Sequence, residues 1–433
     1  MKFVSTRGKA PEITLDRALI AGLAPDGGLY VPESIPVLDA AIIESLARQP
    51  LTRVAVAVLS PYFSGSSLAA KLESICEQAF DFPAPLRALR RDGDHLLELF
   101  HGPTAAFKDY AARFLAGCLS ALRTDDDPET TILVATSGDT GAAVAAAFHR
   151  RPGFRVVILY PDGRVSPAQA HGLGCWGDNV QAFRVAGSFD DCQRLAKQAL
   201  VDESLRKECP LTTANSISLG RLLPQAAYYA KAAVDHRAAH GEVLNLIVPT
   251  GNLGNACAAL VARRMGFPIG ELRLATNANP TLSEYFDGDD YQPRDAIATL
   301  ANAMDVGAPS NFERLRYWYA DDKALREAVR VDRVDDDTIR TVIGDAPGRE
   351  GIIPCPHTAT GLHALRQLRQ EGDQRDWAVV ATAHPAKFTG IVEPLVGQII
   401  AQPPSLETMA ERPSRAEPLP ADYASLKGAL LGV

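Results

Sequence analysis

The chain has 433 residues, of which 46% are hydrophobic and 22% charged, and its net charge is −8. This length exceeds what one simple core holds, so two or three domains are expected, and the composition is that of a soluble globular protein. The acidic balance and the lack of a stripe rich in Lys and Arg argue against nucleic acid and acidic membrane surfaces as partners.

The seven cysteines are odd in number, irregularly spaced and never arranged as C-x-x-C. That usage is typical of reduced thiols rather than of a disulfide framework. The first eight residues contain no apolar core of signal-peptide length, and no stretch approaches the ~20 apolar residues of a membrane span. We therefore expect a cytoplasmic protein that spans no membrane.

Residues 1–95 form an N-terminal region in which helices and turns are expected. The turn at 26–29 leads into a short strand, and helices are predicted at 39–46 and 67–80. Phe82-Pro83-Ala84-Pro85 is interpreted as a linker.

From residue 96 onward, predicted strands and helices alternate. The strands are expected at 96–100, 131–136, 156–160, 180–185, 243–248, 272–276 and 378–382, and the main helices at 142–149, 166–172, 190–201, 219–239 and 254–265. Such alternation predicts an α/β fold in which helices cover both faces of parallel sheets. We divide this part into a smaller α/β domain, residues 96–225, and a larger one, residues 226–433.

One lysine lies at an unusual position in the segment His101 to Tyr110. Gly102-Pro103 ends the first predicted strand, and Thr104 is expected to cap a helix that places Lys108 on its buried side. Burial and a nearby helix N-terminus both lower the pKa of an ammonium group, and a neutral buried lysine can form a Schiff base with an aldehyde cofactor. From this segment alone, a lysine whose amine reaches solvent is the favoured alternative.

Three glycine- or hydroxyl-rich junctions are candidates for binding anions, since backbone N–H groups at a helix N-terminus bind phosphate or carboxylate. They are Ser137-Gly138-Asp139-Thr140-Gly141, Asn215 to Arg221, and Pro249 to Asn255. The last is the best phosphate site because it is rich in backbone donors and has no carboxylate, while Arg221 can bind an anion in bidentate fashion. The alternatives are tight turns that need glycine only for backbone freedom, and a surface arginine behind an N-cap.

Other familiar site motifs are excluded. Residues 172–177 match G-x-G-x-x-G in letters, but they follow a predicted helix and precede a strand, which is the reverse of the dinucleotide-binding context. We identify no histidines paired at metal-ligand spacing and predict no catalytic metal. A reactive lysine, a phosphate site and further anion donors together suggest pyridoxal phosphate, which acts as an electron sink.

Eight segments together resemble the threonine synthase family. They are HGPTAAFKDY (101–110), ATSGDTG (135–141), LYPDGRVSP (159–167), NSISLGR (215–221), PTGNLGN (249–255), GAPSNFERL (307–315), PHTATG (356–361) and TAHPAKF (382–388). DGGLYVP (26–32) resembles the long-chain form, which has an N-terminal domain. The resemblance covers nearly the whole chain in the family's order. It implies a tryptophan-synthase-β-like fold (fold type II), pyridoxal phosphate as cofactor, and conversion of O-phospho-L-homoserine and water to threonine and phosphate by a monomer or homodimer.

The resemblance also implies roles for individual residues. Lys108 would form the Schiff base and move protons, and Thr382 would offer its hydroxyl to the cofactor's pyridine nitrogen. Ser137 and Thr140 would meet the substrate carboxylate, and the two domains would close over the substrate. The remaining assignments are Gly251, Asn252, Leu253, Gly254 and Asn255 for the cofactor phosphate, and Asn215, Ser216 and Arg221 for the departing phosphate.

Some positions are expected to have other roles or depart from the family. Asn279-Pro280 and Cys355 stand where relatives often have an acidic residue, which affects local contacts. Asp109 and Tyr110 are expected to be structural, as are His101 and His384 beside the site. These departures leave the expected reaction unchanged.

Three other functions are consistent with parts of the pattern. A phospholyase or a hydroxyamino-acid dehydratase could share the fold, although NSISLGR favours a phosphorylated substrate. A protein that only binds a phosphorylated metabolite would need Lys108 for structure alone. A nucleotide-dependent α/β enzyme is disfavoured by the missing nucleotide motifs.

Overall fold

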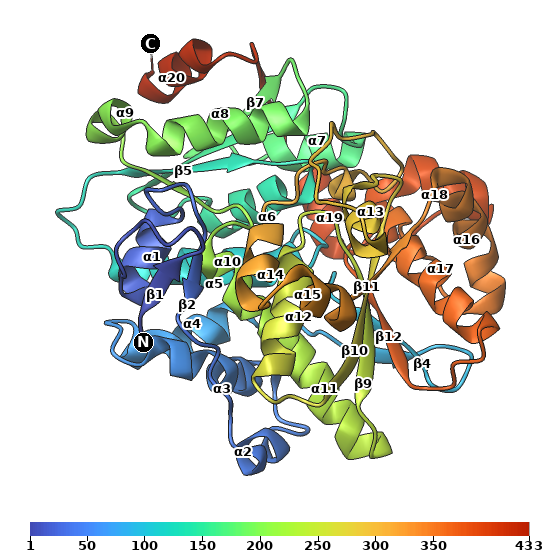
Figure 1. Cartoon of the computed structure of the whole chain (residues 1–433). Helices are drawn as coiled ribbons and strands as arrows, with labels where there is room; N and C mark the ends of the chain where they lie inside the picture. The colour runs from blue at the N-terminus through green and yellow to red at the C-terminus, as the bar shows by residue number, and fades with distance from the viewer. Residues whose placement is uncertain (433) are drawn as a thin grey trace.

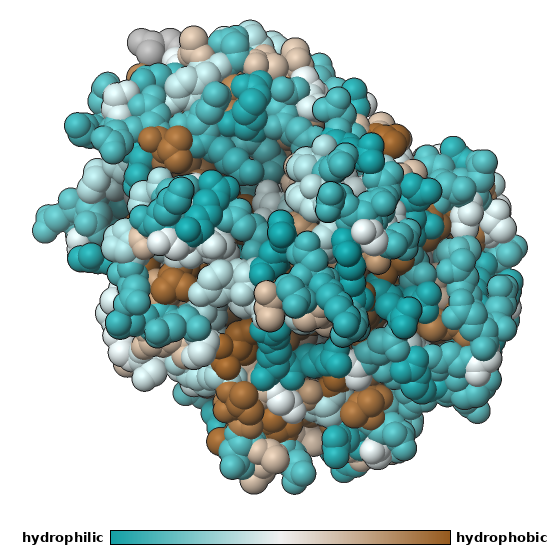
Figure 2. Space-filling view, in the orientation of Figure 1, coloured by the Kyte–Doolittle hydropathy of each residue, from teal (hydrophilic) through white to brown (hydrophobic). Residues whose placement is uncertain are grey.

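The computed structural model describes residues 1–432. Two sheets, both mainly parallel and both covered by helices, make up most of the molecule (Figure 1). This confirms the predicted α/β fold class. Figure 2 shows a mainly hydrophilic surface in this view, with small hydrophobic patches toward its lower end. In the part of the chain that is described, no helix combines the length and the apolar character needed to cross a membrane.

The N-terminal region is mainly helical, as expected, and begins with two strands paired in antiparallel fashion. Its elements are β1 (Phe3–Ser5), α1 (Leu15–Ala21), β2 (Tyr30–Pro32), α2 (Ala40–Ser45), α3 (Leu51–Phe63), η1 (Ala69–Lys71) and α4 (Leu72–Ala79). Apolar positions of α3 recur at helical spacing, among them Val54, Val58 and Tyr62, and this face is buried. The region therefore packs onto the α/β part through one hydrophobic core.

The smaller sheet has five parallel strands in the order β13-β7-β6-β5-β8. Its strands are β5 (Thr130–Ala135), β6 (Phe154–Pro161), β7 (Val180–Val185), β8 (Leu211–Thr213) and β13 (Glu417–Leu419), and its helices are α6 (Asp139–Phe148), α7 (Pro167–Gly174), α8 (Phe189–Val201), α9 (Glu203–Glu208) and α20 (Tyr423–Leu431). The central strands are continuous buried apolar runs because helices cover both faces.

The larger sheet has six strands in the order β11-β10-β9-β12-β4-β3, and only β3 is antiparallel. Its strands are β3 (Leu86–Ala88), β4 (Asp94–Glu98), β9 (Leu244–Pro249), β10 (Ile269–Thr276), β11 (Arg330–Arg333) and β12 (Trp377–Ala381). The other helical elements are α5 (Lys108–Leu122), α10 (Leu219–Leu222), η2 (Leu223–Gln225), α11 (Ala226–His240), α12 (Gly254–Arg264), α13 (Thr281–Asp287), η3 (Asn302–Met304), α14 (Phe312–Trp318), α15 (Asp322–Ala328), α16 (Asp336–Arg349), α17 (Pro356–Gln370), η4 (Pro385–Phe388), α18 (Thr389–Val396) and α19 (Pro404–Ala410).

The sheets do not follow the predicted boundaries at residues 96 and 226. Strand β4, which we assigned to the smaller domain, pairs in parallel with β12 of the larger sheet. Strand β13, near the end of the chain, pairs in parallel with β7 of the smaller sheet. Each sheet therefore combines segments from distant parts of the sequence. How the chain divides into independently folding domains stays a prediction.

Two predicted helix boundaries are wrong for local physical reasons. Helix α5 begins at Lys108 rather than after Thr104, because Ala105 has a left-handed backbone (φ 52°) that a helix cannot include. Thr104 instead donates its N–H and its hydroxyl to the Asp109 carboxylate, at 2.9 and 2.6 Å. The single helix predicted at 219–239 is interrupted around Pro224, which has no N–H to donate.

Candidate active site

One pocket lies at the carboxyl ends of β5, β9 and β12, where ligands bind in parallel α/β sheets. All twelve residues predicted for the site line this pocket, and segments from both sheets contribute them. They are Lys108, Ser137, Thr140, Asn215, Ser216, Arg221, Gly251, Asn252, Leu253, Gly254, Asn255 and Thr382. Their individual roles stay predictions.

Lys108 reaches the pocket because the chain before it is fixed to the end of β12. Ala106 forms an antiparallel bridge with Ala383, and the Phe107 N–H donates to the Thr382 carbonyl at 2.9 Å. Lys108 is the next residue, and only 14% of its side chain is exposed. The alternative of an amine that reaches solvent is therefore wrong. Burial lowers the pKa of Lys108, and a nearby carboxylate opposes this effect only in part.

That carboxylate, Asp139, belongs to a buried charged network that the sequence did not predict. Its Oδ2 lies 3.3 Å from Lys108 Nζ, and its Oδ1 lies 2.7 Å from Lys387 Nζ. Gln169 Nε2 donates to Oδ1 at 3.1 Å. Burial alone would raise the pKa of Asp139, but the Lys387 and Lys108 ammonium groups outweigh it and hold this pKa well below its usual range. Asp139 therefore stays ionised and orients both lysines.

The loop before α12 has the geometry of a phosphate site. Leu253 has a left-handed backbone (φ 63°), and α12 begins at Gly254, so the N–H groups of its first turn have no intrahelical acceptor. At Gly251 a Cβ would lie 2.7 Å from the backbone Cα of Met304, so only glycine allows this close approach. Asn255 Oδ1 accepts from a tyrosine hydroxyl, while its buried Nδ2 has no partner among residues 1–432. These features fit a bound phosphate group.

Arg221 also carries an unpartnered buried group in this pocket. The residue is 2% exposed, so the alternative of a surface arginine is wrong. One guanidinium nitrogen donates to the Ala214 carbonyl, whereas Nε has no partner in the described part of the chain. Burial lowers the pKa of Arg221 to about 10, so the guanidinium still carries its charge at neutral pH.

The neighbours of Arg221 differ in how much of their polar surface is free. The side-chain amide of Asn215 is hydrogen-bonded to both backbone groups of Ala135, at the end of β5. Ser216 Oγ accepts from Asn252 Nδ2 at 2.8 Å and so connects this segment to the phosphate loop. The structure therefore gives Asn215 a clear positioning role at the strand end, whereas a contact with substrate stays a prediction.

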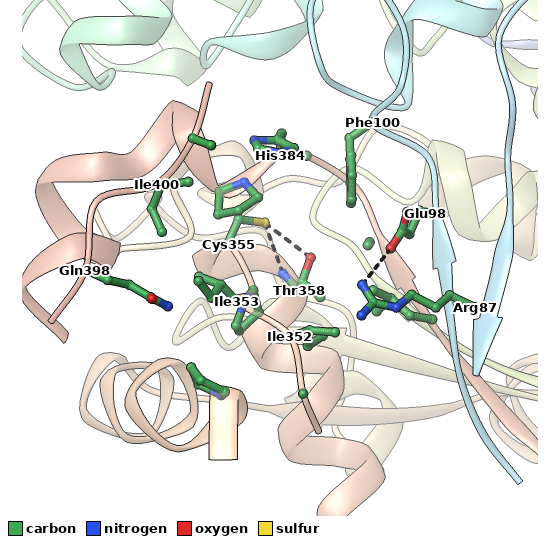
Figure 3. A pocket seen from close by; sticks show the side chains of 18 of the residues that line it. Arg87, Glu98, Phe100, Ile352, Ile353, Cys355, Thr358, His384, Gln398 and Ile400 are labelled. Atoms are coloured by element: carbon green, nitrogen blue, oxygen red, sulfur yellow. Dashed lines mark hydrogen bonds and ion pairs between the residues drawn. The ribbon is translucent and has the colours of Figure 1, made fainter. Parts of the chain in front are cut away.

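A second cavity of about 590 Å³ adjoins the site and contains residues we expected beside it (Figure 3). His384 lines this cavity, while Thr382, two residues earlier, faces the active-site pocket. Cys355 also lies here, and its sulfur caps α17 by accepting from the Thr358 N–H at 3.4 Å. Cys355 is therefore a helix cap in this structure. Asn279 is likewise structural, because its side chain binds the Asn277 amide at 2.9 Å.

The sequence-based statement that no histidines are paired at metal-ligand spacing is wrong. His236 and His240 are four residues apart on α11, which is metal-ligand spacing, and His95 lies beside them. This cluster lies outside the active-site pocket, whose one lining histidine is His357. Burial lowers the pKa of His357 to about 3, so its ring is neutral, and its Nε2 accepts from the Ala303 N–H at 3.1 Å.

Comparison with known proteins identifies the family. The model described as "Threonine synthase N terminus" matches residues 2–80, "Pyridoxal-phosphate dependent enzyme" matches 82–386, and "Threonine synthase, C-terminal" matches 358–429. The threonine synthase of Serratia marcescens is 37% identical, with 100% of both chains covered. The chain belongs to the threonine synthase family. Its cofactor is pyridoxal phosphate, and the chain is a lyase of threonine biosynthesis.

Solved structures support the same relationship. The crystal structure of threonine synthase from Escherichia coli superposes with a TM-score of 0.93 at 35% identity, covering 100% of both chains. A threonine synthase from Brucella melitensis with pyridoxal phosphate bound gives a TM-score of 0.89 at 34% identity, covering 100% of this chain and 99% of that one. The threonine synthase resemblance and the predicted cofactor are thereby confirmed.

Proposed function

We propose that this enzyme converts O-phospho-L-homoserine and water to L-threonine and inorganic phosphate, with Lys108 as the residue that holds the cofactor. The observation that carries the proposal is that one pocket combines a buried lysine with three groups of anion donors. Cofactor and substrate together present three anionic groups: two phosphates and one carboxylate. Residues 251–255, 137–140 and 215–221 supply one donor group for each.

Bound pyridoxal phosphate supplies an electron sink for negative charge that develops on the substrate carbons. Gly251 to Asn255 would hold its phosphate, and the Thr382 hydroxyl would bind its ring nitrogen. A hydroxyl, unlike a carboxylate, does not require that nitrogen to be protonated. Burial lowers the pKa of Lys108, which favours the neutral amine, the form that attacks a carbonyl carbon and accepts a proton.

We assign the remaining steps to charged side chains of the pocket and its surroundings. Lys108 Nζ is the group within the pocket that can take a proton from one substrate carbon and return it to another. Asp139 lines the pocket beside Lys108, and Lys387 contacts Asp139, so we assign both residues to positioning the lysine. Arg221 stabilises the charge that develops on the departing phosphate, since its guanidinium is fixed before the reaction starts.

Water has to enter only at the addition step, so we also propose that the two sheets close over the substrate. The pocket walls support this, because the five-stranded sheet supplies residues 135–140 and the six-stranded sheet supplies 249–255 and 382. Closure would bring the donors for the substrate carboxylate toward the donors for the cofactor phosphate. Small-angle scattering with and without a substrate analogue tests it, and an unchanged radius of gyration would contradict it.

The test of the reaction is a product balance. Wild type, Lys108→Ala and the control Lys9→Ala, which changes an exposed lysine, are incubated with O-phospho-L-homoserine and pyridoxal phosphate. We expect wild type and control to release threonine and phosphate in equal amounts, and Lys108→Ala to release neither and to lack the visible absorbance of the bound cofactor. Phosphate with a keto acid would instead indicate a phospholyase, and no turnover would indicate a binding protein.

We further propose a cytoplasmic location and a monomer or homodimer. Seven cysteines without a disulfide among them, six of these buried, support a reducing compartment. Light scattering on the purified protein tests the oligomeric state, and a trimer or larger assembly would contradict the proposal.

A further inference from the structure

Three histidines meet at the opposite end of the larger sheet from the active-site pocket. His95 lies at the start of β4, and His236 and His240 lie in the last turns of α11. One ring nitrogen from each residue falls within 4.8 Å of the other two. The rings of His236 and His240 are stacked with centroids 4.6 Å apart, and the His95 ring stands edge-on to them at 5.2 and 5.8 Å.

The buried nitrogens of this cluster have no hydrogen-bond partners within residues 1–432. His95 is 6% exposed and His236 is 1% exposed. Nδ1 of His95 and both ring nitrogens of His236 lack a partner that satisfies hydrogen-bond geometry. Buried polar atoms are almost always paired in native proteins, and an unpaired one is unfavourable. Unpartnered buried nitrogens on His95 and His236, with a third imidazole beside them, therefore indicate that something else binds here.

The spacing and the donor type identify that ligand by its chemistry. Residues four apart on a helix lie on the same face, so His236 and His240 direct their rings to one side of α11. Three imidazole nitrogens are the donor set of a divalent transition metal, above all Zn²⁺, which binds histidine at about 2.0–2.1 Å. We propose that His95, His236 and His240 bind one Zn²⁺ ion.

A neighbouring carboxylate completes the arrangement. Asp376 Oδ2 lies 3.0 Å from His236 Nε2, although the contact does not have hydrogen-bond geometry. Metal-binding histidines commonly have such a carboxylate at the second nitrogen, where it fixes the ring orientation. Nδ1 of His236 is then the nitrogen that faces the metal. His240 is the one exposed member of the cluster, so its side chain is the one freest to move toward a bound metal.

The place of the cluster makes the metal structural rather than catalytic. Asp376 and His95 lie at the amino ends of β12 and β4, whereas the active-site pocket is at the carboxyl ends of the strands. A metal here would connect α11 to strand β4 of the six-stranded sheet. The proposal is independent of the reaction, because none of these residues lines the active-site pocket.

Zinc binding is tested on the full-length, cofactor-loaded protein without an affinity tag. After treatment with EDTA, each protein is titrated with Zn²⁺ against a chromophoric chelator, and bound zinc is quantified by elemental mass spectrometry. The variants are His240→Ala and His240→Gln, and the matched control is His149→Ala, which removes a half-buried histidine that pairs with Asp178. Thermal melting with and without Zn²⁺ gives a second measurement.

We expect wild type and His149→Ala to bind one Zn²⁺ per chain. Their affinity for Zn²⁺ should be about 10–100-fold higher than that of either His240 variant. Free Zn²⁺ at 100 times its Kd should raise the Tm of wild type by about 3 °C and leave both His240 variants unchanged. Wild type that binds no zinc, or His240 variants that bind it equally well, would overturn the proposal. A variant that melts in EDTA at the same temperature as wild type is folded. If His240→Ala does not fold, the zinc affinity of His240→Gln decides the test.

Discussion

The buried pair of Asp139 and Lys387 offers a quantitative test of how the active site is held in place. Their charged atoms are 2.7 Å apart, and their side chains are 2% and 3% exposed. Removing one member leaves the other as a buried charge with less compensation, which costs about 3–5 kcal/mol. We therefore expect Asp139→Asn and Lys387→Met each to lower the free energy of unfolding by about that amount.

The double variant should lose less than the sum of the two single losses. With both charges removed, neither member of this pair is left uncompensated. Lys108 loses the same carboxylate in Asp139→Asn and in the double variant, so its contribution cancels and the two changes should couple by at least about 2 kcal/mol. The free energy of unfolding is measured by urea titration of cofactor-free protein, so that cofactor binding does not contribute. Asp162→Asn and Arg184→Met are the control, since this pair is 3.5 Å apart but 54% and 42% exposed and should couple by about 0–1 kcal/mol. Additive losses at Asp139 and Lys387, within about 0.5 kcal/mol, would refute the reasoning.

Three further measurements test other parts of the site. Gly251→Ala should weaken pyridoxal phosphate at least about tenfold in an absorbance titration, because the new Cβ would lie 2.7 Å from the Met304 backbone, whereas Gly390→Ala, with nothing within 4 Å, should not. Arg221→Lys should raise KM for O-phospho-L-homoserine at least about tenfold, because an ammonium cannot replace a bidentate fork, and an unchanged KM would contradict this role. The lowered pKa of Asp139 means that its stabilisation is present above the unfolded carboxyl pKa and is lost as the pH falls toward the folded value. The Tm difference between wild type and Asp139→Asn should thus be constant above about pH 5 and shrink below about pH 4, and a difference that grows in acid would contradict the assignment.

Local patterns in the sequence predicted individual elements better than their partners. The strand predicted at 180–185 coincides with β7, because a short segment of mainly apolar residues bounded by turns indicates a strand, and that information is local. The pairing of β4 with β12 depends on residues far along the chain, and nothing within residues 96–100 specifies the partner. For the same reason, the predicted domain boundaries and the sheets disagree.

The site shows the same division between local and long-range information. Lys108 could be found because helical spacing and a family motif coincide on one segment. The contact of Asp139 with Lys387 could not, because Asp139 begins α6 and Lys387 lies in η4, far along the chain, and the two meet only in the folded protein. Thr104 is a good capping residue by type. Because Ala105 has a left-handed backbone, however, the Thr104 hydroxyl donates to Asp109 instead of capping a helix. His236 and His240, by contrast, are four residues apart, a spacing that is visible in the sequence itself.

The pairing of β4 with β12 also sets the order in which the enzyme can be completed during synthesis. β4 is made early, and at roughly 5–20 residues per second the ribosome produces β12 on the order of 15–60 s later. Until then, β4 and the segment that carries Lys108 have no central strand to pair with, and the smaller sheet waits longer still for β13. A nascent chain that stalls before residue 377 therefore has neither sheet finished and exposes strand edges to which chaperones or other chains can bind.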